Sequence, residues 1–178
     1  MSVARAQAIV NGVTINLTKN TTTGKWEATG TAPSKSSYTL SGHYYGVTLK
    51  AWDEAGNVTT KDVTDSTLGT ALQLIVKEKV APVIVITYPT ASATIINNKP
   101  EIKFKVTDDD SGVNPDSIKI TIDSGSAITA GITKTAVTGG FECTYTPTSA
   151  LADGSHTIKI DAKDFDGNAA VSYTHLRA

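Results

Sequence analysis

Two stretches of the sequence repeat one pattern. Residues 47–57, VTLKAWDEAGN, align with residues 158–168, IKIDAKDFDGN, and the offset is constant, since 164 minus 53 and 168 minus 57 both give 111. Each stretch alternates apolar residues with others, which predicts a β-strand, and then runs into an Asp-x-x-Gly-Asn turn. A constant offset indicates two copies of one structural unit in tandem.

The composition predicts an all-β protein. The 178 residues include 28 Thr, 15 Ile and 14 Val but only 8 Leu. β-Branched residues suit a pleated, half-buried surface, whereas a helical protein of this size would rely on Leu, Ala and Glu. Apolar residues nowhere follow the helical spacing over three turns, so we expect no substantial helix.

The repeat and the turn signals predict two tandem immunoglobulin-like β-sandwiches of Greek-key type. The charged stretch that ends at Pro82 is typical of a short, stiff linker, so we place the first domain at residues 1–79 and the second at 80–178. The alternation within the repeated strands predicts four buried side chains: Val47, Leu49, Ile158 and Ile160.

Charge and hydropathy exclude several partners. The net charge is −1 and the basic residues are scattered, which argues against binding to nucleic acid. No apolar run reaches 18 residues, so we expect no membrane insertion.

Cys143 is the single cysteine and lies in an alternating apolar run, so we expect it to be buried and to form no internal disulfide.

Acidic residues gather after one predicted strand of the second domain. Calcium takes six to eight oxygen ligands, so converging carboxylates there could bind it. The spacing of an EF-hand is absent, however, and turn carboxylates are usually solvated. We therefore expect no cofactor and no metal, and we keep as calcium candidates Asp108, Asp109, Asp110 and Asp116. The sequence leaves open whether Asp153, Asp164 and Asp166 lie at the same end of the sandwich as these candidates or at the other end.

The repeated turns have an ordinary structural explanation. Asp53 and Asp164 can accept backbone N–H groups across the turn, and Gly56 and Gly167 can adopt positive φ.

Catalysis is not indicated. No G-x-S-x-G elbow frames a serine, and no nucleophile, base and orienting residue can be identified together. His43 and His156 are expected at strand edges or on the surface. We expect the protein not to be an enzyme.

Aromatic residues of the first domain are the best candidates for a recognition surface. In the strand that ends at Ala51, alternation places Tyr44 and Trp52 on the face opposite Val47 and Leu49. Exposed aromatic rings can stack on sugars or on a partner protein, although rings more often cover the rim of a sandwich. The ligand-contact candidates are Tyr38, His43, Tyr44 and Trp52.

The chain resembles bacterial and bacteriophage immunoglobulin-like repeats. In the second domain the resemblance rests on APVI at 81–84, VTD at 106–108, SGV at 111–113, the strand 118–123, LADGSHT at 151–157 and DFDGN at 164–168. In the first domain it rests on AP at 32–33, SSY at 36–38, GHYY at 42–45 and DEAGN at 53–57. The resemblance implies extracellular display on a bacterial cell or virion surface, as spacer or adhesive modules within longer chains.

The last eight residues, VSYTHLRA at 171–178, resemble the translation of a sequencing-library adapter. We interpret them as a non-native tail and exclude them from functional reasoning, although Val171 and Tyr173 alternate as a native final strand would.

Two functions from different classes follow. The first is a non-catalytic spacer and adhesion module of a phage tail or bacterial surface protein, with neighbouring domains and a cell-surface glycan or protein receptor as partners. The alternative is a carbohydrate-binding module of a secreted polysaccharide-degrading enzyme. Binding to glycans that depends on Trp52 or Tyr44 would favour the alternative.

Overall fold

The computed structural model describes residues 2–177, and the chain divides into two units, residues 1–77 and residues 78–178. Strands make up nearly all of the regular structure, which confirms the all-β class. The helices of the described residues are two short 3₁₀ turns, η1 (Ser41–His43) and η2 (Gly69–Leu72). Neither is long and apolar enough to cross a membrane.

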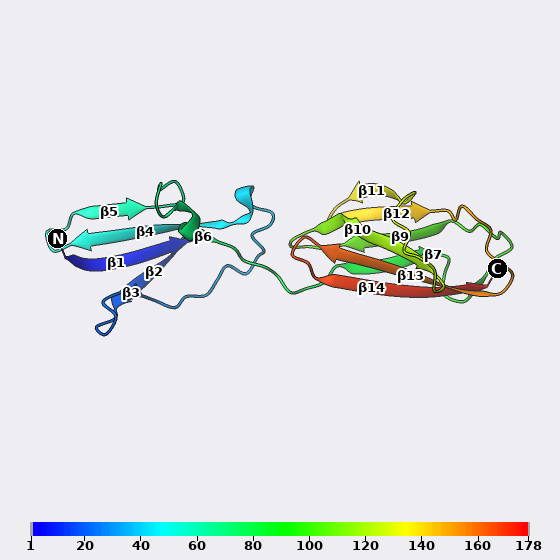
Figure 1. Cartoon of the computed structure of the whole chain (residues 1–178), viewed down its shortest axis with the longest axis horizontal. Helices are drawn as coiled ribbons and strands as arrows, with labels where there is room; N and C mark the ends of the chain where they lie inside the picture. Colours follow the sequence, from blue (N-terminus) through cyan, green and yellow to red (C-terminus); the bar gives the residue numbers. More distant parts are fainter. Residues whose placement is uncertain (1, 178) are drawn as a thin grey trace. The chain divides into compact units, whose positions relative to one another are not determined.

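The strands of the first unit that the structure describes belong to one sheet, in the order β3-β2-β1-β4-β5, with β6 also pairing with β4 (Figure 1). Asn11 and Gly12 adopt positive φ and join β1 to β2 in a hairpin, the turn that an Asn-Gly pair favours. The strands are β1 (Val3–Val10), β2 (Val13–Lys19), β3 (Trp26–Glu27), β4 (Tyr45–Asp53), β5 (Val58–Lys61) and β6 (Gln73–Leu74).

The first unit buries few large side chains. Its buried hydrophobic residues are Ala6, Tyr45 and Leu72. Val47 and Leu49 are only half-buried, as are Thr48 and Lys50 on the other face of β4. The prediction that Val47 and Leu49 are buried is therefore wrong, because no second sheet of this unit covers β4 in the described structure.

The second unit is a sandwich of two four-stranded sheets (Figure 1). One sheet has the order β7-β9-β12-β11 and the other has β10-β13-β14-β8. These orders correspond to the A-B-E-D and C-F-G sheets of an immunoglobulin domain, with the short β8 as an additional strand that pairs in parallel with β14. The strands are β7 (Val83–Tyr88), β8 (Ala93–Thr94), β9 (Ile102–Thr107), β10 (Val113–Ile122), β11 (Thr133–Val137), β12 (Gly140–Tyr145), β13 (Ser155–Asp164) and β14 (Ala169–Arg177).

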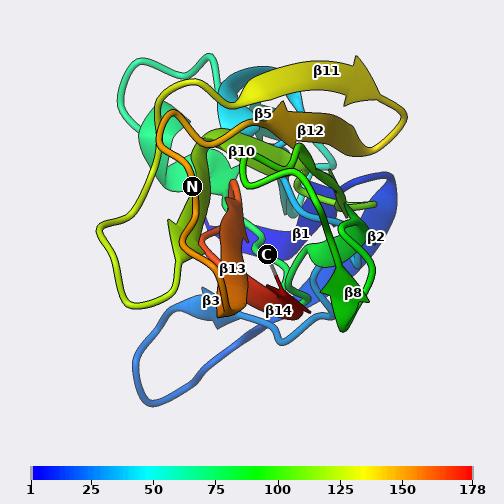
Figure 2. The same ribbon diagram turned by 90° about the vertical axis from the view of Figure 1, so that its right-hand side faces the viewer.

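The core of the second unit lies between its two sheets. Figure 2 shows β11 and β12 on one side of this unit and β13 and β14 on the other. Ile158 and Ile160 of β13 are 0% exposed, which confirms the prediction for this copy of the repeat. Cys143 of β12 is also buried, as predicted, and burial raises the pKa of its thiol to about 11. The other buried members of the core are Ile102, Phe104, Val106, Val113, Ile118, Ile120, Tyr145, Ala162 and Leu176.

Residues 171–177 belong to β14, which pairs along its whole length with β13. Thr174 and Leu176 of this segment are buried, and Leu176 contacts the core. The segment therefore completes one sheet of the sandwich. Its origin as an adapter translation stays a prediction.

Candidate metal centre

The repeated turns have the same hydrogen bonds in both units. The Asp53 carboxylate accepts the backbone N–H and the side-chain amide of Asn57, both at 2.9 Å. The Asp164 carboxylate accepts the same two groups of Asn168, at 2.8 Å and 2.6 Å. Gly56 and Gly167 adopt positive φ, as predicted. The Asp-x-x-Gly-Asn turn therefore has a structural role in both copies, and the side-chain amide of its Asn adds a second hydrogen bond to the Asp carboxylate.

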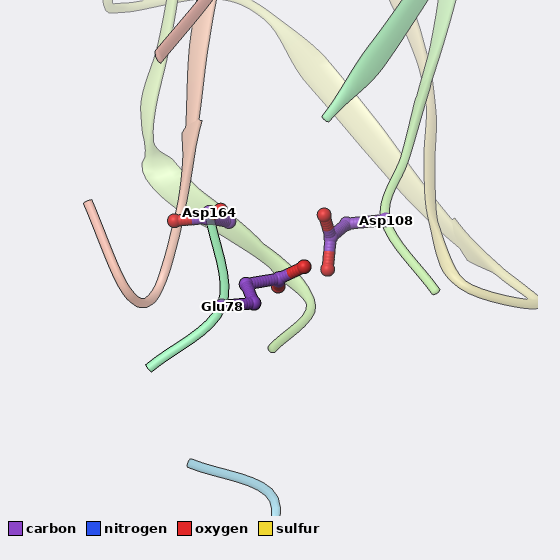
Figure 3. Close-up of side chains that lie close together, drawn as sticks. All are labelled: Glu78, Asp108 and Asp164. Carbon is purple, nitrogen blue, oxygen red and sulfur yellow. The ribbon is translucent and has the colours of Figure 1, made fainter. Parts of the chain in front are cut away.

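In the second unit this turn has acidic neighbours. The carboxylates of Glu78, Asp108 and Asp164 converge, and one oxygen of each lies within 4.8 Å of the others (Figure 3). Asp164 is 1% exposed and Asp108 is 8% exposed, while Glu78 is half-buried. Three carboxylates thus meet at one end of the sandwich with little access to water.

The topology of the sandwich brings these residues together. Glu78 precedes β7 and Asp108 follows β9, and these strands are antiparallel, with Val83 opposite Thr107. The start of one strand therefore meets the end of the other. Asp164 is the last residue of β13 in the facing sheet.

Hydrogen bonds hold each carboxylate in place. The Oδ1 atom of Asp108 accepts the N–H groups of Asp110, at 3.1 Å, and Gly112, at 2.7 Å, so the turn wraps around this side chain. The Oε1 atom of Glu78 accepts the Ser111 N–H at 2.7 Å. The backbone of Glu78 is also fixed, because its N–H donates to Oδ2 of Asp166 at 2.9 Å.

Within the described residues, no lysine, arginine or histidine forms an ion pair with any of the three carboxylates. At an effective dielectric constant of 20, two unit charges 4.8 Å apart repel by about 3.5 kcal/mol. A cation would remove that repulsion. The ligand set consists of oxygen atoms alone, which suits calcium or magnesium and not zinc, which prefers nitrogen and sulfur.

Only one of the four calcium candidates proposed from the sequence lies in this carboxylate cluster. Asp108 belongs to the cluster, whereas Asp109 and Asp116 are exposed and Asp110 is half-buried, and these three lie outside it. Sequence reasoning missed Glu78, because it reads as part of a linker. It left open whether Asp164 lies at the same end of the sandwich as Asp108, and the structure places it there, because β13 ends at Asp164 close to the turn that follows β9.

The aromatic candidates of the first unit contact other side chains. The ring of Tyr38 stacks on His43, with centroids 4.3 Å apart. The guanidinium of Arg5 lies 3.8 Å from the centre of the Trp52 ring, in a cation–π contact. Tyr44 is half-buried, and a Cβ added to Gly42 would lie 2.6 Å from its ring. Of the four candidates, Tyr38 and His43 thus form a stacked pair, whereas Trp52 is paired with Arg5.

His156 is buried, which corrects the expectation that it lies at an edge or on the surface. Its Nε2 atom lies 2.8 Å from the carbonyl oxygen of Ala152, and its Nδ1 atom lies 2.9 Å from Oδ2 of Asp123. Both partners are acceptors, so both ring nitrogens donate when the imidazole is protonated. The Ala152 carbonyl, followed by Asp123, raises the pKa of His156, and His156 in turn lowers the pKa of Asp123.

Comparison with known proteins identifies the second unit. Residues 82–160 match the family described as Bacterial Ig domain. No curated protein matches the chain.

Several solved structures resemble parts of the chain. CopC from Methylosinus trichosporium OB3b is 22% identical over 54% of this chain and 91% of that chain, with a TM-score of 0.41. Dimeric latent PorU from Porphyromonas gingivalis is 16% identical over 99% of this chain and 20% of that one, with a TM-score of 0.47. The protocadherin GammaB4 extracellular domain is 14% identical over 97% of this chain and 25% of its own, with a TM-score of 0.44.

This chain thus spans about a fifth of the PorU structure and a quarter of the protocadherin structure. The strand orders of the second unit agree with the match over residues 82–160, so this part of the chain has the fold of an immunoglobulin-like sandwich and is similar in sequence to the bacterial Ig domains.

Proposed function

We propose that this chain is a non-catalytic spacer and adhesion module, displayed as part of a longer protein on a bacterial cell or a phage tail. The observation that carries the proposal is the match of the second unit to the bacterial immunoglobulin-like domains, which are typically extracellular or surface-displayed. A sandwich with its own core holds its shape without neighbours and can separate functional domains within a chain.

The chemistry of the described side chains supports a non-catalytic role. Both ring nitrogens of His156 are engaged by Asp123 and Ala152, and Nδ1 of His43 contacts the Tyr38 carbonyl. Cys143 is buried in the core and its pKa is raised, so its thiolate is disfavoured. These histidines and this cysteine are therefore poorly placed to act as a base or a nucleophile.

The carbohydrate-binding alternative has less support. Arg5 lies over one face of the Trp52 ring, and His43 lies over one face of Tyr38. A sugar that stacked on these faces would have to displace a side chain. We therefore expect the aromatic rings to stabilise the first unit and not to bind a glycan.

A glycan array with the intact chain tests this choice. We expect no binding by the wild type. Millimolar or tighter binding that is lost in Trp52→Ala and Tyr44→Ala, but kept in Tyr173→Ala, would contradict the proposal and favour the carbohydrate-binding module. Tyr173 is a matched control because it is an exposed aromatic residue on β14 of the second unit.

The full open reading frame provides the second test. Further immunoglobulin-like repeats beside a wall anchor or tail segment would support the spacer and adhesion role. A flanking polysaccharide-degrading domain would contradict it.

A further inference from the structure

We propose that the second unit binds one calcium ion between Glu78, Asp108 and Asp164. The proposal goes beyond the spacer and adhesion role, because it assigns a ligand to one end of the sandwich. It departs from the expectation drawn from the sequence, in which Asp108 was a solvated turn residue, Asp164 a structural turn residue and Glu78 part of the linker. The reason is that the fold brings together three acids that lie far apart in the sequence.

The spacing of the oxygens fits one ion. Calcium–oxygen distances are about 2.3–2.6 Å, so two oxygens on opposite sides of the same ion lie about 5 Å apart. One oxygen of each of the three carboxylates lies within 4.8 Å of the others, so a single ion can contact all three.

The cluster retains capacity to bind a cation. The described hydrogen bonds of Glu78 and Asp108 use Oε1 and Oδ1, respectively. Each carboxylate oxygen has two lone pairs, so Asp164 can also contact an ion while it accepts both groups of Asn168. The hydrogen bonds fix the side chains and leave acceptor sites for the ion.

A buried hydroxyl provides an independent indication of a ligand. Ser111 is 2% exposed, and its Oγ atom has no hydrogen-bond partner among the described residues. The backbone N–H of Ser111 donates to Glu78 Oε1, and the neighbours on both sides of Ser111 donate to Asp108 Oδ1. Because N and Oγ of one serine lie within about 3.7 Å of each other, the hydroxyl is at the border of the cluster.

An unpaired buried hydroxyl is rare, since it loses its bonds to water. An ion in the cluster would give Ser111 Oγ a partner and would neutralise the three carboxylates at the same time. We assign calcium in preference to magnesium, because calcium accepts six to eight ligands in flexible geometry, whereas magnesium requires a near-ideal octahedron with shorter bonds.

The ion would connect three parts of the second unit: the segment that leads into β7, the turn after β9 and the end of β13. It would thereby fasten the first residue of the unit to both sheets.

Calorimetric titration of the EDTA-treated full chain with calcium chloride tests the proposal. We expect one ion per chain and a rise in the melting temperature of the second unit by roughly 10 °C at a hundredfold excess over the dissociation constant. Glu78→Gln and Asp108→Asn each remove a ligand charge and keep an acceptor oxygen, so we expect each to weaken binding by about tenfold or more.

Three controls complete the experiment. Asp53→Asn changes the matched turn of the first unit, and Asp116→Asn changes an exposed acid outside the cluster; both should bind calcium as the wild type does. Ser111→Ala should weaken binding without destabilising the calcium-free protein, because it deletes an unpaired hydroxyl.

Absence of binding at millimolar calcium would overturn the proposal. So would binding that Glu78→Gln and Asp108→Asn leave unchanged, or equal affinity for magnesium.

Discussion

The two units contain the same strand and turn in different surroundings. In each, the repeated strand is flanked by an antiparallel strand on both sides, β1 and β5 around β4, and β10 and β14 around β13. In the second unit a facing sheet covers β13, and Ile158 and Ile160 are completely buried. In the first unit, the equivalent Val47 and Leu49 remain half-buried.

The comparison shows that one local pattern does not determine burial. Alternation specifies which side chains share a face of a strand, and the Asp-x-x-Gly-Asn turn specifies how the strand ends. Whether that face is removed from water depends on a partner sheet formed by residues distant in sequence. The same reasoning applies to the acids, since Asp53 and Asp164 form the same turn but, among the described residues, only Asp164 belongs to a cluster of three converging carboxylates.

The largest expected difference concerns the core. Ile160→Ala deletes a fully buried side chain, so it should reduce the free energy of unfolding of the second unit by about 2–5 kcal/mol, through lost burial and a cavity. Leu49→Ala should cost the first unit clearly less, because its side chain is half-buried. Urea unfolding of the full chain measures the two losses in free energy of unfolding, and calorimetry resolves the separate transitions of the two units. Equal losses in the two variants would contradict this prediction, because they would mean that Leu49 is as well buried as Ile160.

The second expected difference concerns the repeated turn. Asp164→Ala leaves the Asn168 N–H and amide without their acceptor in a buried place, and this loss of hydrogen bonds should cost about 1–3 kcal/mol, reduced by the repulsion from Glu78 and Asp108 that the variant relieves. Asp53→Ala removes the same hydrogen bonds from Asn57 at a more exposed place, where water can replace the carboxylate, so its loss should be smaller. Thermal melts in EDTA compare the variants without any contribution from a metal. A larger loss of stability in Asp53→Ala than in Asp164→Ala would contradict the prediction.

The smallest expected effect is a pH dependence confined to the second unit. The pKa of His156 is raised in the folded state, so its contribution to stability is complete below the unfolded value and is lost as the pH rises through the folded value. The pKa of Asp123 is lowered, so its contribution is present above the unfolded value and is lost as the pH falls through the folded one. Stability should therefore be highest between the unfolded pKa values of Asp and His, about pH 4 to 6.5.

Denaturant midpoints from pH 5 to pH 8.5 test this prediction. The second unit should become less stable across this range, and His156→Gln should remove most of the slope. His175→Gln is the matched control, because His175 is exposed on β14. A slope that persists in His156→Gln would show that another group is responsible.

Much of the fold could be predicted from the sequence. The Asn11-Gly12 hairpin, the strand of Ile158 and Ile160, and the buried Cys143 follow from local rules: turn residues that tolerate positive φ, and alternation along a strand. The hydrogen bonds of Asp53 and Asp164 across their turns follow from the same local chemistry, since donor and acceptor lie only four residues apart.

Only the tertiary structure decided the rest. The convergence of Glu78, Asp108 and Asp164 requires that β7, β9 and β13 align their ends, and each pair of these acids is separated by at least 30 residues along the chain. The burial of His156 similarly depends on Asp123 and Ala152 meeting around its ring. The sequence by itself determined the strands and turns of this protein because those depend on neighbouring residues, whereas burial and the clustering of charges depend on which distant segments pack together.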